Sequence, residues 1–194
     1  MDIGVLRMVQ ERFDNAIKRY GEKVIIDGVE YDAVIRHKPV GETLDYDDKR
    51  IITAADITRG TLINYKGKDY VVISEVNDKR YDIYYDAIMR RVPIVIDVSR
   101  WTWKATGTGW DYEFIDAFPT PCFVSTMSTT EEGKYAWDFQ KIIVIVPDRP
   151  EFHDPQLNMV KFRLFNTEWK CMATSMDTSK PGLNFWHCDW ASLL

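Results

Sequence analysis

The sequence predicts a mainly β protein in which an N-terminal helix is followed by two small antiparallel β-barrel-like domains. Three observations predict this fold class. A strong helical spacing of apolar residues is confined to the first twenty residues, short strand patterns separated by turn residues follow, and the composition changes at Pro93. We therefore expect a helix over 1–21, a small barrel over 22–92 and a second, Trp-rich β domain over 93–194.

The helix is predicted by apolar residues that recur at steps of three and four. These residues are Ile3, Leu6, Val9, Phe13, Ile17 and Tyr20. Lys18 and Arg19 fall in the last turn, where they favour the negative end of the helix dipole, and Gly21 suits the position after that turn. Leu6 and Phe13 are candidate interface residues, because the apolar face would pack on the barrel or on a neighbouring subunit.

The first barrel is predicted by two hairpins and a closing strand. Apolar and polar residues alternate around Asp27-Gly28, a dipeptide suited to a type I′ turn. A second hairpin is expected over 61–74, with its turn near Lys66-Gly67, and residues 81–91 form the closing strand. Short strands at this spacing indicate a small antiparallel barrel.

The second domain differs in composition from the first. All seven Trp and all three Cys lie beyond residue 100, whereas eight of the ten Tyr precede it. We expect 93–121 to be irregular, with a strand-and-loop pattern around 101–110. Strands are expected to return at 122–127, 141–146, 160–165, 169–174 and 183–190.

Two hairpins, one in each half, follow the same residue pattern. Residues 65–70 and 164–169 each place a large apolar residue, a turn with Gly or Asn, an acidic residue and an aromatic residue in that order. The pattern favours two tandem barrels, the second being a degenerate copy of the first. The alternative is a chance resemblance between two hairpins, since the match is one of residue class.

Charge, hydropathy and cysteine usage exclude several classes of protein. The formal charge of −5 argues against a surface that neutralises phosphates, and basic residues form no cluster larger than adjacent pairs such as Lys79-Arg80 and Arg90-Arg91. Apolar runs such as 142–146 are far shorter than the roughly 20 residues that cross a bilayer, and no secretory signal is visible. An odd number of cysteines in such a chain indicates free thiols in a reducing compartment.

Catalytic and metal-binding patterns are not found. The three histidines are His37, His153 and His187. No Ser lies in a Gly-x-Ser-x-Gly motif, so a hydrolytic triad is not expected. Cys171, His187 and Cys188, with His153 or Cys122, could supply metal ligands, but zinc sites usually pair their ligands at Cys-x(2–4)-Cys spacing. Neighbouring residues of a strand point to opposite faces. We expect no catalytic residue, no metal and no cofactor.

Two further clusters allow more than one interpretation. The acidic residues Glu42, Asp45, Asp47 and Asp48 lack the spacing of a calcium-binding loop, so they indicate a solvated loop. The second cluster is Trp101, Trp103 and Trp110. These rings could fill a barrel core, anchor a contact between subunits or form a stacking platform for sugars.

Three segments in the first half of the chain carry a resemblance to a known family: VIIDGVEY at 24–31, DITRGTLINYKGKDYVVISE at 56–75 and YYDAIMRR at 84–91. With these segments, this half of the chain resembles the head-closure (stopper, or head–tail connector) proteins of tailed phages that infect Gram-positive bacteria. The family pattern is Ile-x-x-Gly-Asp, then Trp or Tyr, then Gly-x-x-Tyr-Leu-Val. Tyr65 stands where the first aromatic residue is common, and Thr61 replaces the usual Asp after Gly60. Residues beyond Pro93 match nothing in that family.

The resemblance implies a structural virion protein at the phage neck or head–tail interface, made in the host cytoplasm, and not an enzyme. Such proteins form rings through head-to-tail contacts, here of about six or twelve copies. The ring would join portal and adaptor proteins to the tail and help retain packaged DNA, which passes through without specific binding. No membrane is involved.

Within such a ring, the acidic cluster becomes a candidate channel loop, because carboxylates that face the lumen would repel DNA. The interface candidates are Leu6, Phe13, Trp101, Trp103 and Trp110. Two alternatives remain open. One is a tail-completion protein or another tail component, and the other is a carbohydrate-binding or adhesion module that uses exposed Trp residues.

Overall fold

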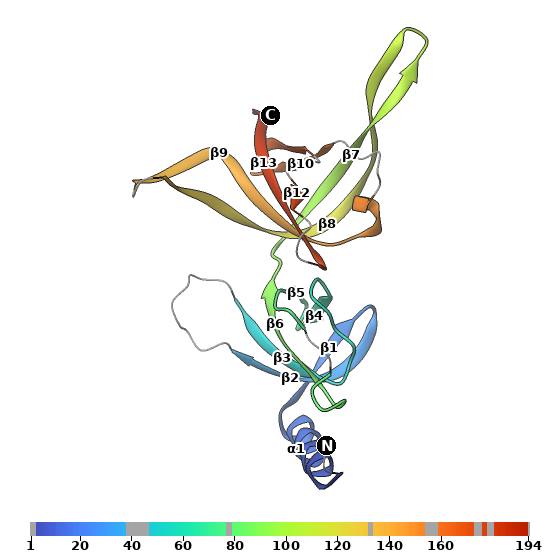
Figure 1. Ribbon diagram of the computed structural model, residues 1–194, viewed down its shortest axis with the longest axis vertical. Helices are drawn as coiled ribbons and strands as arrows, with labels where there is room; N and C mark the ends of the chain where they lie inside the picture. The colour runs from blue at the N-terminus through green and yellow to red at the C-terminus, as the bar shows by residue number, and fades with distance from the viewer. Residues whose placement is uncertain are drawn as a thin grey trace. The chain divides into compact units, whose positions relative to one another are not determined.

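The computed structural model confirms the predicted fold class: a mainly β chain with one N-terminal helix and two closed antiparallel barrels. The structure describes residues 3–37, 47–76, 79–131, 134–153, 159–172, 176–177 and 181–193. The chain divides into two compact units, Met1–Val92 and Pro93–Leu194, and each is described by itself (Figure 1).

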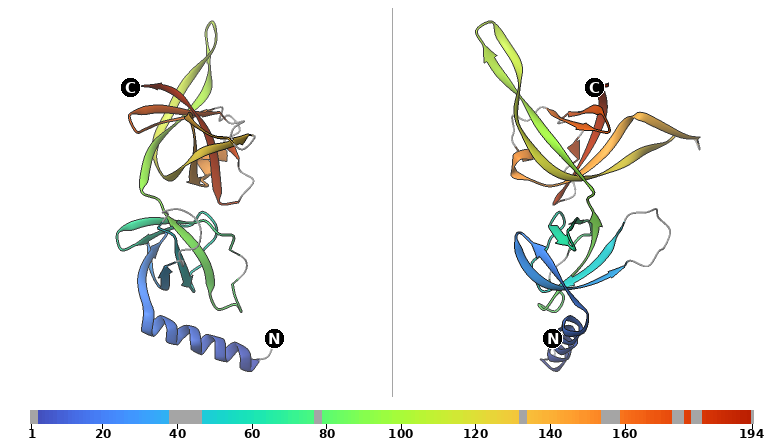
Figure 2. Two further views of the ribbon diagram at one scale, coloured as in Figure 1. Left: turned by 90° about the vertical axis from the view of Figure 1, so that its left-hand side faces the viewer. Right: turned by 180° about the vertical axis from the view of Figure 1, so that it is seen from behind.

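The N-terminal helix α1 spans Ile3–Tyr20 and continues directly into strand β1 (Gly21–Ile26). Lys18 and Arg19 lie in its last turn, as the dipole favours. Gly21 ends the helix for a steric reason, because a side chain there would collide with the backbone carbonyl of Ile17. Figure 2 shows α1 at one end of the first barrel, beyond the strands.

The first barrel closes six strands in the order β1-β2-β3-β6-β5-β4, with every neighbouring pair antiparallel. The strands after β1 are β2 (Val29–His37), β3 (Lys49–Thr53), β4 (Leu62–Tyr65), β5 (Lys68–Val72) and β6 (Tyr85–Arg91). Both predicted hairpin turns are present. Asp27 and Gly28 have φ values of 50° and 79°, and Lys66 and Gly67 have values of 52° and 72°, as type I′ turns require.

The second unit also closes a six-stranded antiparallel barrel. Its elements are β7 (Ile94–Thr106), β8 (Gly109–Glu131), β9 (Lys134–Pro147), the 3-10 helix η1 (Pro150–His153), β10 (Met159–Leu164), β11 (Thr167–Met172), β12 (Met176–Asp177) and β13 (Leu183–Leu193). The sheet order is β11-β10-β7-β8-β9-β13-β12, and pairing of β11 with β13 closes the ring. The short β12 pairs with β13 at Phe185 and Trp186, nearer the start of β13 than the residues that pair with β11.

One sequence-based expectation for this unit was wrong. Residues 93–121 are not irregular, because β7 and β8 form one long antiparallel hairpin. The pairing runs from Ile94 opposite Cys122 to Thr106 opposite Gly109, with one bulge at Ser99/Arg100. The glycines at 107 and 109 form the tip of this hairpin and do not interrupt its strands. Residues 102–106 of β7 pair with β8 alone, so the outer hairpin is a two-stranded ribbon.

The two barrels share one topology. When the strands of each unit are numbered from its own start and β12 is left out, both close in the order 1-2-3-6-5-4. The β4–β5 and β10–β11 hairpins then occupy equivalent positions. Their turns match as well, since Phe165 and Asn166 have φ values of 53° and 57°. The internal similarity at 65–70 and 164–169 therefore reflects a repeated fold.

Each barrel has its own core of alternating inward side chains. In the first unit the core residues are Val24, Ile26, Ala33, Ile51, Ala55, Ile57, Ile63, Tyr65, Tyr70, Val72, Ala87 and Met89. In the second unit the fully buried Trp186 packs edge-on against Phe152, with ring centroids 4.8 Å apart. Phe162 and Trp169 belong to the same cluster. The aromatic rings here replace the smaller aliphatic residues that dominate the first core.

Candidate interaction surfaces

The first barrel covers the apolar side of α1 only in part. No residue of α1 is buried, although its charged and apolar residues are separated onto two faces. Phe13 stacks on Tyr84 with ring centroids 5.3 Å apart, and Leu6 is half-buried. Ile3 is 83% exposed. A helix of this length gains most of its stability from packing of its apolar face, so this face is a candidate contact for another chain.

The predicted acidic cluster is held at its C-terminal end by two ion pairs. Asp47 accepts hydrogen bonds from Lys49 Nζ at 2.6 Å and from the Tyr70 hydroxyl at 2.9 Å. Asp48 binds Arg90 through two parallel hydrogen bonds of 2.8 and 2.9 Å. These two carboxylates therefore have cationic partners inside the first unit.

The ion pair between Lys49 and Asp47 also changes the pKa values of the groups around it. The ammonium group of Lys49 lowers the pKa of Asp47, and burial, together with the hydrogen bond to Asp47, raises the pKa of Tyr70 to about 12. The other two members of the predicted cluster, Glu42 and Asp45, lie outside the described residues.

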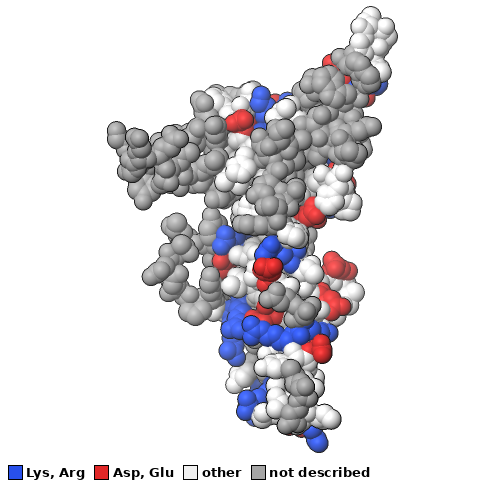
Figure 3. Space-filling view, viewed as in Figure 1, with Lys and Arg blue, Asp and Glu red and all other residues white. Residues whose placement is uncertain are grey.

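A pocket of about 490 Å³ opens on the first barrel and collects basic side chains from separate segments. Its lining residues are Arg36, His37, Arg50, Ser74, Glu75, Arg80, Asp86, Ala87 and Ile88. We call this site the arginine pocket. Figure 3 shows Lys and Arg side chains gathered over the part of the first barrel nearest α1, although the whole chain is acidic.

Asp86 organises the arginine pocket. Its side chain is only 7% exposed and accepts two hydrogen bonds from Arg50, at 2.7 and 2.5 Å. Arg80 lies 3.6 Å from the same carboxylate. The guanidinium of Arg50 lowers the pKa of Asp86, so this carboxylate stays ionised and fixes one arginine in place.

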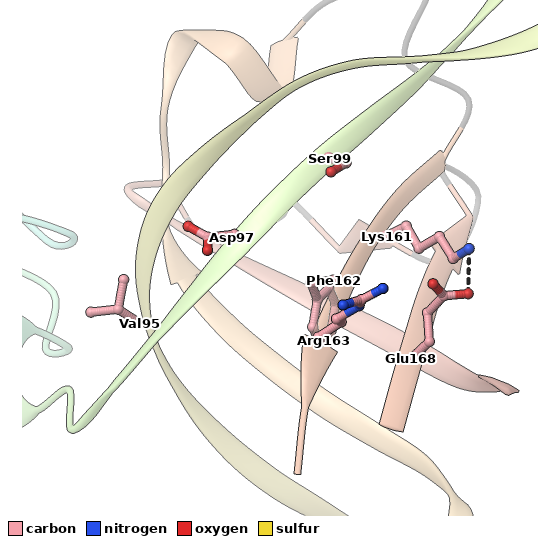
Figure 4. Close-up of a pocket in the computed structure, with 7 residues that line it drawn as sticks. All are labelled: Val95, Asp97, Ser99, Lys161, Phe162, Arg163 and Glu168. Carbon is pink, nitrogen blue, oxygen red and sulfur yellow. Dashed lines mark ion pairs between the residues drawn. The ribbon is translucent and has the colours of Figure 1, made fainter. Parts of the chain in front are cut away.

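A second pocket, of about 460 Å³, lies on the second barrel between β7 and β10. It is lined by Val95, Asp97, Ser99, Lys161, Phe162, Arg163 and Glu168. Figure 4 shows the three β7 residues spaced along one strand, and Lys161 paired with Glu168. The pairing of β7 with β10 ends at Ser99 opposite Lys161, so the two strands separate beyond this point. The pocket is the gap that this separation leaves.

The residues considered for metal binding or catalysis do not converge on one site, although the Cys171 and Cys188 thiols are neighbours in the core of the second unit. His153 contacts Asp148 at 2.7 Å, and His37 lines the arginine pocket in the other unit. Cys122, Cys171 and Cys188 are free and buried. Within the described part of the chain, no group of three or more His, Cys, Asp or Glu side chains is positioned to hold a metal ion.

The three tryptophans singled out from the sequence lie on the β7–β8 hairpin. Trp101 and Trp103 belong to β7, and Trp110 belongs to β8. Their side chains are outside the described residues, so the core, interface and sugar-binding interpretations all stay predictions. Trp169 and Trp186 are core residues of the second barrel.

Sequence reasoning missed the arginine pocket because it looked for basic residues that are adjacent in the chain. Arg36 lies on β2, Arg50 on β3 and Arg80 just before β6, and the closure of the barrel brings them together. The strand pairing of β2 with β3 was the missing information. Residues directly opposite on paired strands are neighbours in space whatever their distance along the chain.

The fold and these surfaces define a class of protein: a tandem β-barrel protein whose amphipathic N-terminal helix has an incompletely buried apolar side. Residues 5–91, which span α1 and the first barrel, match the family model of the YomX N-terminal domain. This family is phage-associated, and the likeness indicates a phage-encoded protein. A phage origin agrees with the resemblance found in the sequence, whereas a head-closure role is not part of the match.

The match covers less than half of the chain and none of the second unit. No curated protein and no solved structure is significantly similar to this chain. Among the described residues, no helix has both the length and the apolar character needed to cross a membrane.

Proposed function

We propose that this protein is a ring-forming structural component of the phage neck, a head-closure or head–tail connector protein. The observation that carries the proposal is the incompletely buried apolar face of α1, in a domain that matches a phage-associated family. Its partners would be further copies of itself, the portal or adaptor above and the tail proteins below. Assembly would occur in the host cytoplasm, and the assembled protein would reside in the virion.

The helix supplies one half of the ring contact in this proposal. Leu6, Val9 and Phe13 lie on one side of α1, and all three are half-buried at most. Docking of this side on the neighbouring subunit is a contact between two different surfaces, and such contacts close into a ring when the rotation between subunits allows it. Completing the burial of each large apolar side chain would stabilise the contact by less than the value for full burial, about 1.5–3 kcal/mol, because these side chains are already half-buried.

The acidic stretch has a defined place in the same proposal. Asp47 and Asp48 anchor its C-terminal end to the first barrel through Lys49 and Arg90, so we assign them a structural role. Glu42 and Asp45 remain the candidates for carboxylates that face the channel and repel DNA. Deletion of 42–46 would then leave the fold intact and impair retention of packaged DNA.

The proposal is tested by light scattering and negative-stain imaging of the purified protein, alone and mixed with portal, adaptor and tail proteins of the same phage. We expect rings, and we expect Leu6→Asp with Phe13→Asp to abolish them. Asn15→Asp adds the same type of charge on the exposed side of α1 and should leave the rings intact. A wild-type protein that stays monomeric and binds none of these partners would overturn the proposal.

The same mixing experiment addresses the main alternative, a tail-completion protein or another tail component. A neck protein should bind the portal or adaptor as well as the tail. Binding to tail proteins alone would favour the alternative and reject the head-closure role.

A further inference from the structure

The arginine pocket contains an arrangement that costs stability and that the barrel fold does not require. Arg36 on β2 and Arg50 on β3 are directly opposite each other in the antiparallel pair. Like charges at such positions repel each other and destabilise a sheet. A third guanidinium, Arg80, comes from the chain just before β6 and lines the same pocket.

The carboxylates of the pocket compensate only part of this charge. The Asp86 carboxylate accepts two hydrogen bonds from Arg50 and lies 3.6 Å from Arg80. Glu75 lies 3.7 Å from Arg59, which is outside the pocket lining. Within the described residues, Arg36 forms no ion pair, and its side chain is exposed.

We propose that the arginine pocket binds a phosphate group of a DNA backbone. Guanidinium groups present planar forks of donors that match phosphate oxygens. Arg36 and Arg80 would supply such donors, and Arg50, whose Nε and Nη2 are bound to Asp86, would add its positive charge. Cationic groups that approach from different segments suit a tetrahedral phosphate. The bound phosphate would offset the repulsion between Arg36 and Arg50.

Two neighbouring groups add to the fit. The Ser74 oxygen accepts a hydrogen bond from the backbone N–H of Ile88 at 2.9 Å, so its own hydroxyl hydrogen can be donated to a phosphate oxygen. Ala87 and Ile88 give the pocket an apolar part, which suits the sugar next to a backbone phosphate.

The overall charge of the chain limits this contact to one place. A chain with a formal charge of −5 repels the rest of a DNA molecule, so the pocket would hold DNA weakly, locally and without reading its sequence. This inference goes beyond the proposed ring, because it concerns a nucleic-acid contact that a single subunit can make.

The test measures fluorescence anisotropy of a short labelled oligonucleotide, single-stranded and duplex, with the full-length protein at low salt. We expect Arg36→Gln with Arg80→Gln to weaken binding at least about tenfold. The slope of log K against log salt should fall by about one for each arginine removed. Arg163→Gln, on β10 of the second unit, removes the same charge from another exposed site and should leave binding unchanged.

Arg50 is left intact in these variants because Asp86 depends on it, and thermal unfolding of each variant checks that the barrel is folded. Two competitors identify the ligand. Inorganic phosphate should displace the oligonucleotide, and polyglutamate should not do so at equal charge. Wild-type protein that binds no DNA, a double variant that binds as wild type, or equally good displacement by polyglutamate would each overturn the proposal, the last in favour of an acidic protein segment.

Light scattering on the same samples separates this inference from the proposed function. Rings without DNA binding would reject the phosphate site alone, and DNA binding by a persistent monomer would reject the ring alone.

Discussion

Asp48 and Arg90 form a two-hydrogen-bond ion pair that joins the residue just before β3 to strand β6, 42 positions further along the chain. The Asp48 side chain is 11% exposed, so water screens the pair only weakly. We predict that Asp48→Asn destabilises the first unit by about 1–3 kcal/mol. Urea unfolding followed by circular dichroism measures this loss.

A solvent-exposed ion pair in the same barrel provides the control. Lys23 pairs with Asp32 at 3.0 Å, but both side chains are at least half exposed. Lys23→Gln should leave the free energy of unfolding nearly unchanged, because water screens this pair. An equal effect of the two substitutions would show that the Asp48 pair is not a structural anchor.

Asp86 makes the stability of the first unit sensitive to acid. Its pKa is lower in the folded chain than in the unfolded chain, chiefly because Arg50 donates two hydrogen bonds to it. The resulting stabilisation is complete above the unfolded-state pKa of about 3.9 and is lost as the pH falls below it through the folded-state value. Asp86→Asn should therefore lower stability at neutral pH and flatten its decline in acid. Urea unfolding at a series of pH values measures both.

Glu11→Gln is the matched control for this pH series, since Glu11 forms an exposed ion pair with Arg7 on α1. It should leave the acid limb of the stability curve unchanged. A decline in acid that is as steep in Asp86→Asn as in the wild type would assign that decline to other carboxylates.

The type I′ turn at Lys66-Gly67 requires a residue that tolerates a positive φ. Gly67 has a φ of 72°, and a Cβ atom added there would meet no other atom within 4 Å. Gly67→Ala should therefore destabilise the barrel by about 1 kcal/mol through backbone strain alone. Thermal unfolding measures this change.

The equivalent turn in the second unit allows the reverse substitution. Asn166 has a φ of 57°, so Asn166→Gly should be neutral or slightly stabilising. Marked destabilisation by Asn166→Gly would show that its side chain, and not its backbone conformation, determines the choice of residue.

The three thiols should be unreactive in the folded protein. Burial raises the pKa of Cys122 to about 12, and the neighbouring Cys171 thiol, together with burial, raises that of Cys188. Because the thiolate is the reactive form, a thiol reagent such as DTNB should label no cysteine at neutral pH until denaturant is added, and three afterwards. Rapid labelling of any cysteine in the native protein would contradict this.

The sequence allowed local features to be predicted better than long-range ones. The helix and both type I′ turns follow from residue spacing and from dipeptides such as Asp27-Gly28, whose effects are local. The β7–β8 hairpin was missed because the residues around Gly107 and Gly109 resemble a loop, while their pairing depends on partners up to 28 positions apart, from Ile94 to Cys122.

The sites illustrate the same limit. Leu6 and Phe13 could be selected from helical spacing, and the structure buries their side of α1 only in part. Asp47 and Asp48 were grouped with their acidic neighbours, but their partners Lys49, Tyr70 and Arg90 come partly from distant strands. The convergence of Arg36, Arg50 and Arg80 depends entirely on the order in which the strands pair.

Closure of both sheets has a consequence for a chain that would work at high local concentration in an assembling particle. In a closed barrel the backbone hydrogen-bonding groups of each strand are occupied on both sides, so one chain cannot template the strands of the next. In the described part of the chain, open edges include β12, the separated ends of β7 and β10 and the outer parts of the β7–β8 and β8–β9 hairpins. The strands that form the wall of each barrel are thereby protected from amyloid-like aggregation.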